Sequence, residues 1–175
     1  MAVHQILEIP DPRLRLISTP VAGVDNETRV LIDEMFETMY AAKGIGLAAI
    51  QIGVPKRVLV IDLQEEEDAD GKVIRAPRVF INPEVMPDTE EHAVYTEGCL
   101  SVPDQYADVE RPASCRVTWL DAEGSPHDEQ LTGLLATCIQ HEMDHLEGIL
   151  FVDHLSRLKR DMVLKKLAKQ RKAAA

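Results

Sequence analysis

The sequence has no long apolar run and few cysteines. Its longest uninterrupted apolar stretches, such as residues 58–61, are far too short to cross a bilayer. The N-terminus also lacks the basic, apolar and small-residue pattern of a signal peptide. Three cysteines without paired spacing do not make a disulfide framework and fit a reducing compartment. These absences predict a cytoplasmic protein with no membrane span, in which any special cysteine would be a metal ligand or a nucleophile.

Basic residues are outnumbered by acidic ones, and they are unevenly distributed. The chain has 19 Lys and Arg against 30 Asp and Glu, a formal net charge of −11. Residues 156–175 nevertheless hold eight basic residues and one acid, Asp161, so they carry +7 and leave −18 on the rest (11 basic against 29 acidic). An acidic body disfavours nucleic acid, and nothing indicates sequence-specific recognition of it. The basic end could dock locally on phosphate, or it could be an ordinary solvated helix end.

A phosphate-binding loop is missing as well. Gly44 and Gly46 lie in the stretch Gly-Ile-Gly-Leu-Ala-Ala-Ile-Gln, which allows a turn and close approach of the backbone to another group. No Gly-Lys-Ser/Thr follows, and a helix, not a strand, is predicted to end in these glycines. Nucleotide binding is therefore not expected here.

The most informative stretch is Gln140-His141-Glu142-Met143-Asp144-His145. Residues four apart on a helix lie on nearly the same side, so both imidazoles can meet one metal ion. Glu142 flanks that ion, where a carboxylate could hydrogen-bond a bound water. The alternative is a surface helix with solvated charges, but the apolar flanks of this stretch indicate a buried helix whose polar groups need partners.

The remaining pattern predicts one catalytic domain over residues 1–175, ending in a basic helix over 156–175. We expect an α+β fold with mixed or antiparallel sheets around a central metal-binding helix, an N-terminal helix and a C-terminal helix. We expect helices over residues 26–42, 132–148 and from Ser156, and strands over 58–63, 79–82, 93–96 and 115–120. We also expect an extended segment over residues 1–20 and an exposed acidic hairpin loop over 64–72. On the last helix, the apolar spacing predicts that Leu155, Leu158, Met162 and Leu167 face the core.

Two histidines do not complete a catalytic metal site, which needs a third protein ligand. A single-helix metalloprotease would have a histidine at position 151, but Phe151 stands there. The downstream acids Asp153 and Asp161 do not lie in a convincing ligand helix. Cys99 is the upstream candidate because a thiolate is a strong ligand and Gly98 lets the backbone approach the ion. An isolated cysteine is more often a small core residue, which is the prediction for Cys115 and Cys138.

Three stretches together resemble one family. Residues 44–51, Glu97-Gly98-Cys99-Leu100-Ser101, and residues 140–145 with their His-Glu-x-x-His pattern are similar, in order and separation, to the three signature motifs of peptide deformylase. The ending, residues 153–156 into a basic helix, is similar to Gram-negative-type bacterial members. The resemblance implies a metal-dependent hydrolase that removes the N-formyl group from the formyl-methionine of nascent polypeptides and releases formate.

The resemblance also implies roles for individual residues. Cys99, His141 and His145 would bind the metal, and Glu142 would act as acid and base. The Gln51 side chain and the Leu100 backbone N–H would stabilise the developing negative charge on oxygen. The residues that would bind the substrate, along the peptide or near the pocket for the methionine side chain, are Ile45, Gly46, Glu97, Leu134, Thr137 and Cys138. The family implies ferrous iron, Fe(2+), as the physiological metal, with Zn(2+) or Ni(2+) as replacements.

The sequence departs from the family pattern at one position and leaves two other kinds of metal site possible. Many bacterial members have arginine where this chain has Tyr106, which concerns polar contacts to the peptide and not the chemistry. A metalloprotease with another third ligand, or a structural metal site, would keep the same helix. Because the substrate would be a nascent chain, we also predict that residues 156–175 dock on the anionic ribosome surface.

Overall fold

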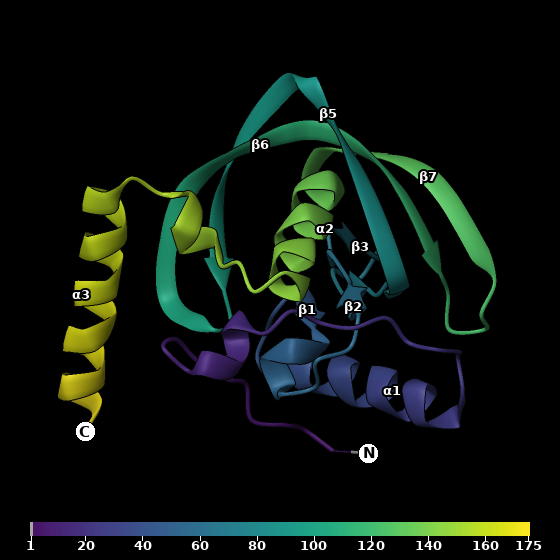
Figure 1. Ribbon diagram of the computed structural model, residues 1–175, viewed down its shortest axis with the longest axis horizontal. Helices are drawn as coiled ribbons and strands as arrows, with labels where there is room; N and C mark the ends of the chain where they lie inside the picture. Colours follow the sequence, from purple (N-terminus) through teal and green to yellow (C-terminus); the bar gives the residue numbers. More distant parts are fainter. Residues whose placement is uncertain (1) are drawn as a thin grey trace.

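The computed structural model describes residues 2–175, and a single helix lies at its centre. Helix α2 is enclosed by the long curved strands β5, β6 and β7, while the N-terminal half of the chain closes the opposite side (Figure 1). The main sheet has the order β1-β2-β5-β6-β7, and all its strand pairs are antiparallel. Its strands are Gly46–Ala48 (β1), Val58–Ile61 (β2), Arg78–Cys99 (β5), Val102–Leu120 (β6) and Pro126–Thr132 (β7). The predicted α+β class is confirmed.

The helices agree closely with the predicted ones. They are α1 (Asn26–Ala41), α2 (Gly133–Leu146) and α3 (Arg157–Ala174), with short 3-10 turns η1 (Pro12–Arg15), η2 (Ala49–Ile52) and η3 (Phe151–His154). Asp25 caps α1, since its carboxylate accepts the Thr28 N–H at 2.8 Å. After α2, Gly148 has a φ of +72°, and a Cβ there would lie 2.5 Å from the Arg15 carbonyl oxygen. Glycine thus lets the N-terminal segment pass tightly under the end of the central helix.

The strands differ more from prediction. Residues 79–82 and 93–96, expected as separate strands, belong to one strand of 22 residues. Its pairing with β6 shifts register between Ile81 and Glu84, a span that contains Pro83, and between Asp88 and His92, directly after Pro87. A proline has no N–H to donate to a neighbouring strand. Such irregularities bend a strand, here around α2. Strand β7 was not predicted, because this edge strand is mostly polar and only Leu131 in it is buried.

The core holds α2 against the sheet. Ile139 and Leu146 of α2 pack with Leu59, Phe80 and Trp119 from three strands. Cys115 belongs to the same cluster, as predicted, whereas Cys138 is only half-buried at its edge. Apolar contacts from several strands hold α2 in place. The backbone positions of the side chains that α2 directs toward Cys99 are therefore fixed.

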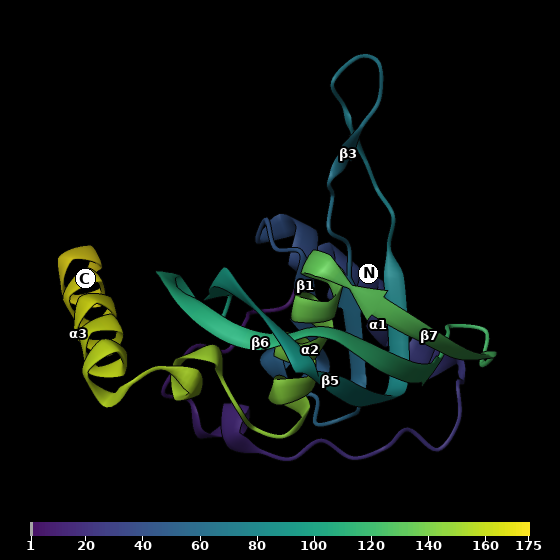
Figure 2. The ribbon, with the colours of Figure 1, turned by 90° about the horizontal axis from the view of Figure 1, so that it is seen from above.

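The prediction for the inner face of α3 was wrong in part. Leu158 and Met162 are 73% and 51% exposed, while Val163 and Leu167 are buried. Helix α3 lies at the edge of the molecule and contacts it along one side (Figures 1 and 2). The buried side is therefore decided by contacts with distant segments, including Ile9, and not by apolar spacing alone.

The acidic segment forms the expected hairpin. Strands β3 (Glu66–Glu67) and β4 (Val73–Ile74) make a separate two-stranded sheet that projects from the body (Figure 2). Among the helices of residues 2–175, none has the length and apolar character needed to cross a membrane.

Candidate metal centre and substrate cavity

Helix α2 and the end of β5 bring three potential metal ligands together. His141 and His145 lie one turn apart on α2, with ring centroids 5.1 Å apart. Cys99, the last residue of β5, places its Sγ 3.4 Å from His145 Nε2. The ligand atoms of the three residues all lie within 4.8 Å of one another. The structure therefore brings together the three residues that were expected to act as ligands.

This donor set suits a catalytic metal ion. Two imidazoles and one thiolate leave a position open on a four-coordinate ion, and they suit zinc or ferrous iron. The His145 ring is 1% exposed, and burial, together with the neighbouring His141, holds its pKa well below the usual value. A neutral imidazole is the form that binds a metal. The residues present thus fit one divalent ion.

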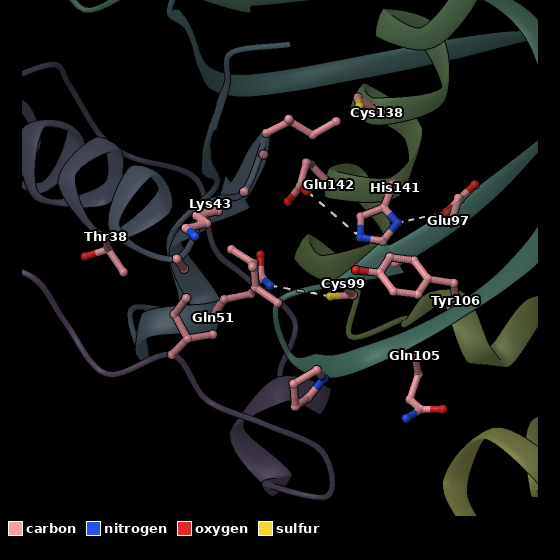
Figure 3. A pocket seen from close by; sticks show the side chains of 18 of the residues that line it. Thr38, Lys43, Gln51, Glu97, Cys99, Gln105, Tyr106, Cys138, His141 and Glu142 are labelled. Atoms are coloured by element: carbon pink, nitrogen blue, oxygen red, sulfur yellow. Dashed lines mark hydrogen bonds and ion pairs between the residues drawn. The ribbon is translucent and has the colours of Figure 1, made fainter. Parts of the chain in front are cut away.

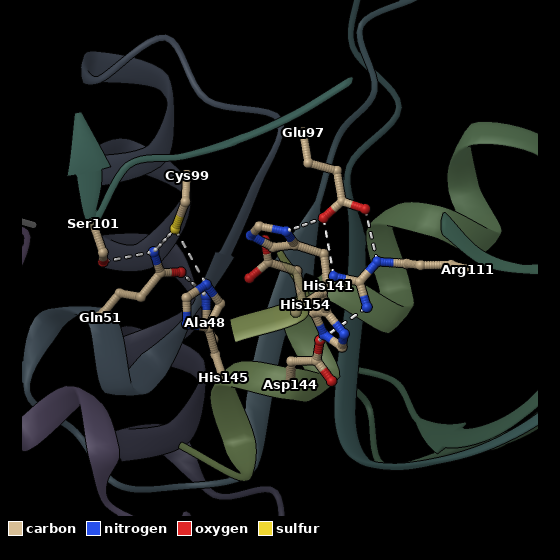
Figure 4. A network of polar contacts seen from close by, with 11 residues as sticks. Ala48, Gln51, Glu97, Cys99, Ser101, Arg111, His141, Asp144, His145 and His154 are labelled. Carbon is tan, nitrogen blue, oxygen red and sulfur yellow. Dashed lines mark hydrogen bonds and ion pairs between the residues drawn. The ribbon is translucent and has the colours of Figure 1, made fainter. Parts of the chain in front are cut away.

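The Nδ1 atom of His141 is hydrogen-bonded to a buried ion pair formed by Glu97 and Arg111. Glu97 Oε1 lies 2.8 Å from His141 Nδ1, so the ring directs Nε2 toward Cys99 and His145. Arg111 donates to both Glu97 oxygens, at 2.7 and 2.9 Å, and both side chains are about 5% exposed (Figure 4). Burial alone would raise the pKa of Glu97, but the bonds from His141 and Arg111 keep it below its usual range. Although Glu97 lines the cavity, these contacts favour positioning of His141 over substrate binding.

Glu142 is buried on the cavity side of the three ligands. Its Oε1 lies 3.9 Å from His141 Nε2, and its buried Oε2 has no protein partner (Figure 3). Burial raises the pKa of Glu142 to about 7. A carboxylate with a pKa near neutrality can both take and return a proton.

Gln51 is held next to Cys99 by its own hydrogen bonds. Its Oε1 accepts the Ala48 N–H at 2.9 Å, and its Nε2 donates to Ser101 Oγ at 3.0 Å. The same Nε2 lies 3.6 Å from Cys99 Sγ. The amide therefore presents an N–H at the ligand group in one fixed orientation.

A cavity of about 900 Å³ opens onto this group. Its wall includes every predicted site residue except His145, which is 1% exposed. These wall residues are Ile45, Gly46, Gln51, Glu97, Cys99, Leu100, Leu134, Thr137, Cys138, His141 and Glu142. Leu134, Thr137 and Cys138 come from the first turns of α2, while Gly46 begins β1 and Ile45 directly precedes it. Residues far apart in the chain thus form one concave site whose volume lies in the range of ligand-binding pockets.

A family model described as "Polypeptide deformylase" matches residues 3–161. The chain belongs to the peptide deformylase family. The peptide deformylase of Rhizorhabdus wittichii is 73% identical over 173 residues, covering 99% of this chain and 98% of that protein. The one from Zymomonas mobilis is 63% identical over 172 residues, covering 98% and 97%. The predicted family and its Gram-negative type are confirmed.

Solved structures agree with the sequence comparison. A crystal structure of peptide deformylase from Ehrlichia chaffeensis superposes with a TM-score of 0.89 at 41% identity, covering 99% of both chains. A structure of the Ehrlichia chaffeensis enzyme in complex with actinonin has a TM-score of 0.88 at 43% identity, covering 97% of this chain and 98% of that one. The expected activity, hydrolytic removal of the N-formyl group from nascent polypeptides, is that of the peptide deformylase family and is confirmed at that level.

Some residues of this deformylase site were not predicted from the sequence. Arg111 stands in Glu-Arg-Pro, which reads as an exposed turn, yet it is 5% exposed. Ser101 is part of a recognised motif but was assigned no role, and it holds Gln51. Tyr106 was expected near the bound peptide, and it does line the cavity; its contact with Gly98, where a Cβ would come within 2.5 Å of the ring, was not expected. Only the pairing of Gly98 with Tyr106 across β5 and β6 reveals this contact.

Proposed function

We propose that Cys99, His141 and His145 hold one divalent metal ion at which this chain hydrolyses the formyl amide. The observation that carries the proposal is the convergence of these three ligand atoms within 4.8 Å, beside the buried Glu142 and at the wall of the cavity. When bound, the ion polarises the formyl group and lowers the pKa of water.

Glu142 is the proposed acid and base. Its carboxylate takes a proton from the attacking water and delivers a proton to the departing amine, so that formate and a free N-terminus result. Its raised pKa, about 7, lets the same group serve both steps near neutral pH. Its unpartnered oxygen is available for a water molecule.

Gln51 and Leu100 are proposed to stabilise the charge that develops on the formyl oxygen. Donors fixed in advance lower a transition state more than donors that must reorient. The Gln51 amide is fixed by Ala48 and Ser101, and the Leu100 backbone follows Cys99 directly. Both residues line the cavity beside the ligand group.

The substrate is proposed to lie along Ile45 and Gly46, with its methionine side chain near Leu134, Thr137 and Cys138. An unbranched thioether suits an apolar slot. Burial raises the pKa of Cys138 to about 12, so its thiol stays protonated and acts only as part of the wall.

Ferrous iron is our proposal for the physiological metal, with zinc or nickel as substitutes. The donor set supports this choice, because thiolate and imidazole suit all three ions and occupancy then follows availability. We further propose that the whole chain, residues 1–175, works in the cytoplasm as one catalytic domain.

Helix α3 is proposed as a docking element for the ribosome surface. Its basic residues include Lys165, Lys166, Lys169 and Lys172, all exposed. The exposed Leu158 and Met162 lie on the same helix and add apolar surface to it. Anionic RNA would attract such a helix in a salt-dependent manner.

Formate release from a formyl-methionyl peptide tests the proposal directly. Anaerobically purified protein of measured metal content should release formate rapidly, whereas the Cys99→Ser variant should lose metal and turnover together. Release without any dependence on Cys99 would contradict the ligand set. No release at full metal occupancy would contradict the function and reopen the metalloprotease and structural-site alternatives.

A further inference from the structure

A network of five hydrogen-bonded side chains leads from His141, one of the proposed metal ligands, to the molecular surface. His141 Nδ1 bonds Glu97, whose carboxylate takes two bonds from Arg111. The remaining Nη1 of Arg111 donates to Asp144 Oδ2 at 2.8 Å. His154 Nε2 lies 2.7 Å from that same oxygen (Figure 4). Because a carboxylate only accepts, His154 Nε2 must carry the proton of this bond.

Exposure rises outward from the buried pair of Glu97 and Arg111, while His141 at the other end of the network is 10% exposed. Arg111 and Glu97 have side chains that are 5% and 6% exposed, Asp144 is 20% exposed, and His154 is 36% exposed. The inner groups are a buried charged set whose geometry depends on every partner being in place. The outer end, made by Asp144 and His154, is more open to solvent than the pair of Glu97 and Arg111.

The network ties together the two elements that carry all three ligands. Glu97 and Cys99 are two residues apart at the end of β5, where the pairing with β6 shifts register between Gly98 and Cys99. His141 and Asp144 are three residues apart on α2, so they are neighbours on the helix. Arg111 of β6 bonds to both Glu97 and Asp144 and thereby links the thiolate's strand to the imidazoles' helix.

We propose that His154 is a positioning residue for the metal centre, acting through Asp144 and Arg111 on the spacing between Cys99 and the two histidines. The N–H of His154 donates to Asp144 Oδ2, the same oxygen that accepts a hydrogen bond from Arg111. This second bond keeps the carboxylate oriented toward the guanidinium. Without His154, Asp144 can turn to water, and Arg111 loses one of its two anchors. Glu97 and the orientation of His141 then become less well defined. This inference rests on the proposed metal site.

The measurement is the rate at which bound Co²⁺ passes to a chromophoric chelator, together with the visible spectrum of the Co²⁺ protein. Partners that bond a ligand directly change metal affinity by about 10–100-fold. His154 acts from further away, so His154→Leu should speed release about threefold to tenfold and shift the Co²⁺ bands. His154→Gln, which keeps an N–H at the place of Nε2, should behave like the wild type, and the shorter His154→Asn should behave like His154→Leu.

His127 provides a matched control. It also bonds an aspartate, Asp121, at 2.7 Å and is 38% exposed, but it lies on β7. His127→Leu should leave release and spectrum unchanged.

Unaltered release and spectrum in both His154→Leu and His154→Asn would overturn the inference. Equal changes in His154→Gln and His154→Leu, or in His127→Leu, would overturn it too, because the N–H of His154 would then not be the cause. If His154→Leu does not fold, the Gln and Asn pair decides. Wild-type protein that binds no Co²⁺ would contradict the metal site itself, whereas a wild type that binds Co²⁺ without any effect of His154 contradicts only this inference.

Discussion

Gly46 and Glu142 face each other so closely that a Cβ on Gly46 would lie 2.7 Å from Glu142 Oε1. Gly46 begins β1 and Glu142 is in α2, so the contact joins the proposed peptide-binding edge to the proposed base. A Cβ essentially never approaches another atom so closely, and either the carboxylate or the strand must therefore move if a side chain is added. The backbone at Gly46 thus restricts the position of the Glu142 carboxylate.

Gly46→Ala should lower kcat/KM for a formyl-methionyl peptide by about 100-fold, the order expected for a displacement of about 1 Å at a reacting group. Metal content should not change, because the three atoms nearest to that Cβ all belong to Glu142 and not to a proposed ligand. Gly23→Ala is the control, since no atom lies within 4 Å of a Cβ there. Wild-type kcat/KM in Gly46→Ala would show that Glu142 tolerates the shift.

Glu142→Ala should keep its metal and lose nearly all turnover, by about 10²–10⁴-fold, because it removes the group that moves the proton. Metal analysis and formate release on the same sample separate the two effects. Substantial deformylation by the variant would exclude Glu142 as the base.

Asp153 should contribute stability that depends on pH. Burial alone would raise its pKa, but Arg15 and the Leu150 N–H outweigh burial and hold the pKa below its usual value. A lowered folded-state pKa means stability that is present above the unfolded value, about 4, and lost as pH falls through the folded value. Asp153→Asn should therefore reduce the free energy of unfolding at pH 7 by roughly 1 kcal/mol, after allowance for solvent screening.

Urea denaturation at several pH values checks this. The difference between wild type and Asp153→Asn should be constant from pH 7 to about 5 and shrink below about 4. Asp161→Asn, at an exposed carboxylate on α3, serves as the control. A difference that grows toward low pH would have the wrong sign for an ionised Asp153.

Replacing Lys165, Lys166, Lys169 and Lys172 by glutamine should weaken ribosome binding and flatten its salt dependence. Each phosphate contact that is lost reduces the slope of log K against log salt by about 0.7–0.9. These lysines are exposed, so hydrolysis of a short formyl-peptide should be unchanged. Arg160 and Arg171 are left intact because they pair with Asp153 and Glu8 of the body. Unchanged ribosome affinity would refute docking by this face.

The sequence by itself determined the metal helix, because the spacing of His141 and His145 is a property of the helix alone. Their convergence needs nothing beyond 3.6 residues per turn. Residue chemistry made Cys99 a weak candidate for the third ligand and the resemblance strengthened it, and the structure brings its sulfur to 3.4 Å from His145 Nε2. Helix ends were predictable for the same local reason, through the Asp25 cap and Gly148.

Only the tertiary structure decided the features that depend on distant partners. Strand β7 has little apolar pattern of its own and exists through its pairing with β6. The buried side of α3 is chosen by the segment around Ile9, so Leu158 and Met162 are exposed despite their spacing. Arg111 reads as a surface residue until β5, β6 and α2 meet around it. Local periodicity specifies which way side chains point within one element, whereas burial of a charge depends on which elements the fold brings together.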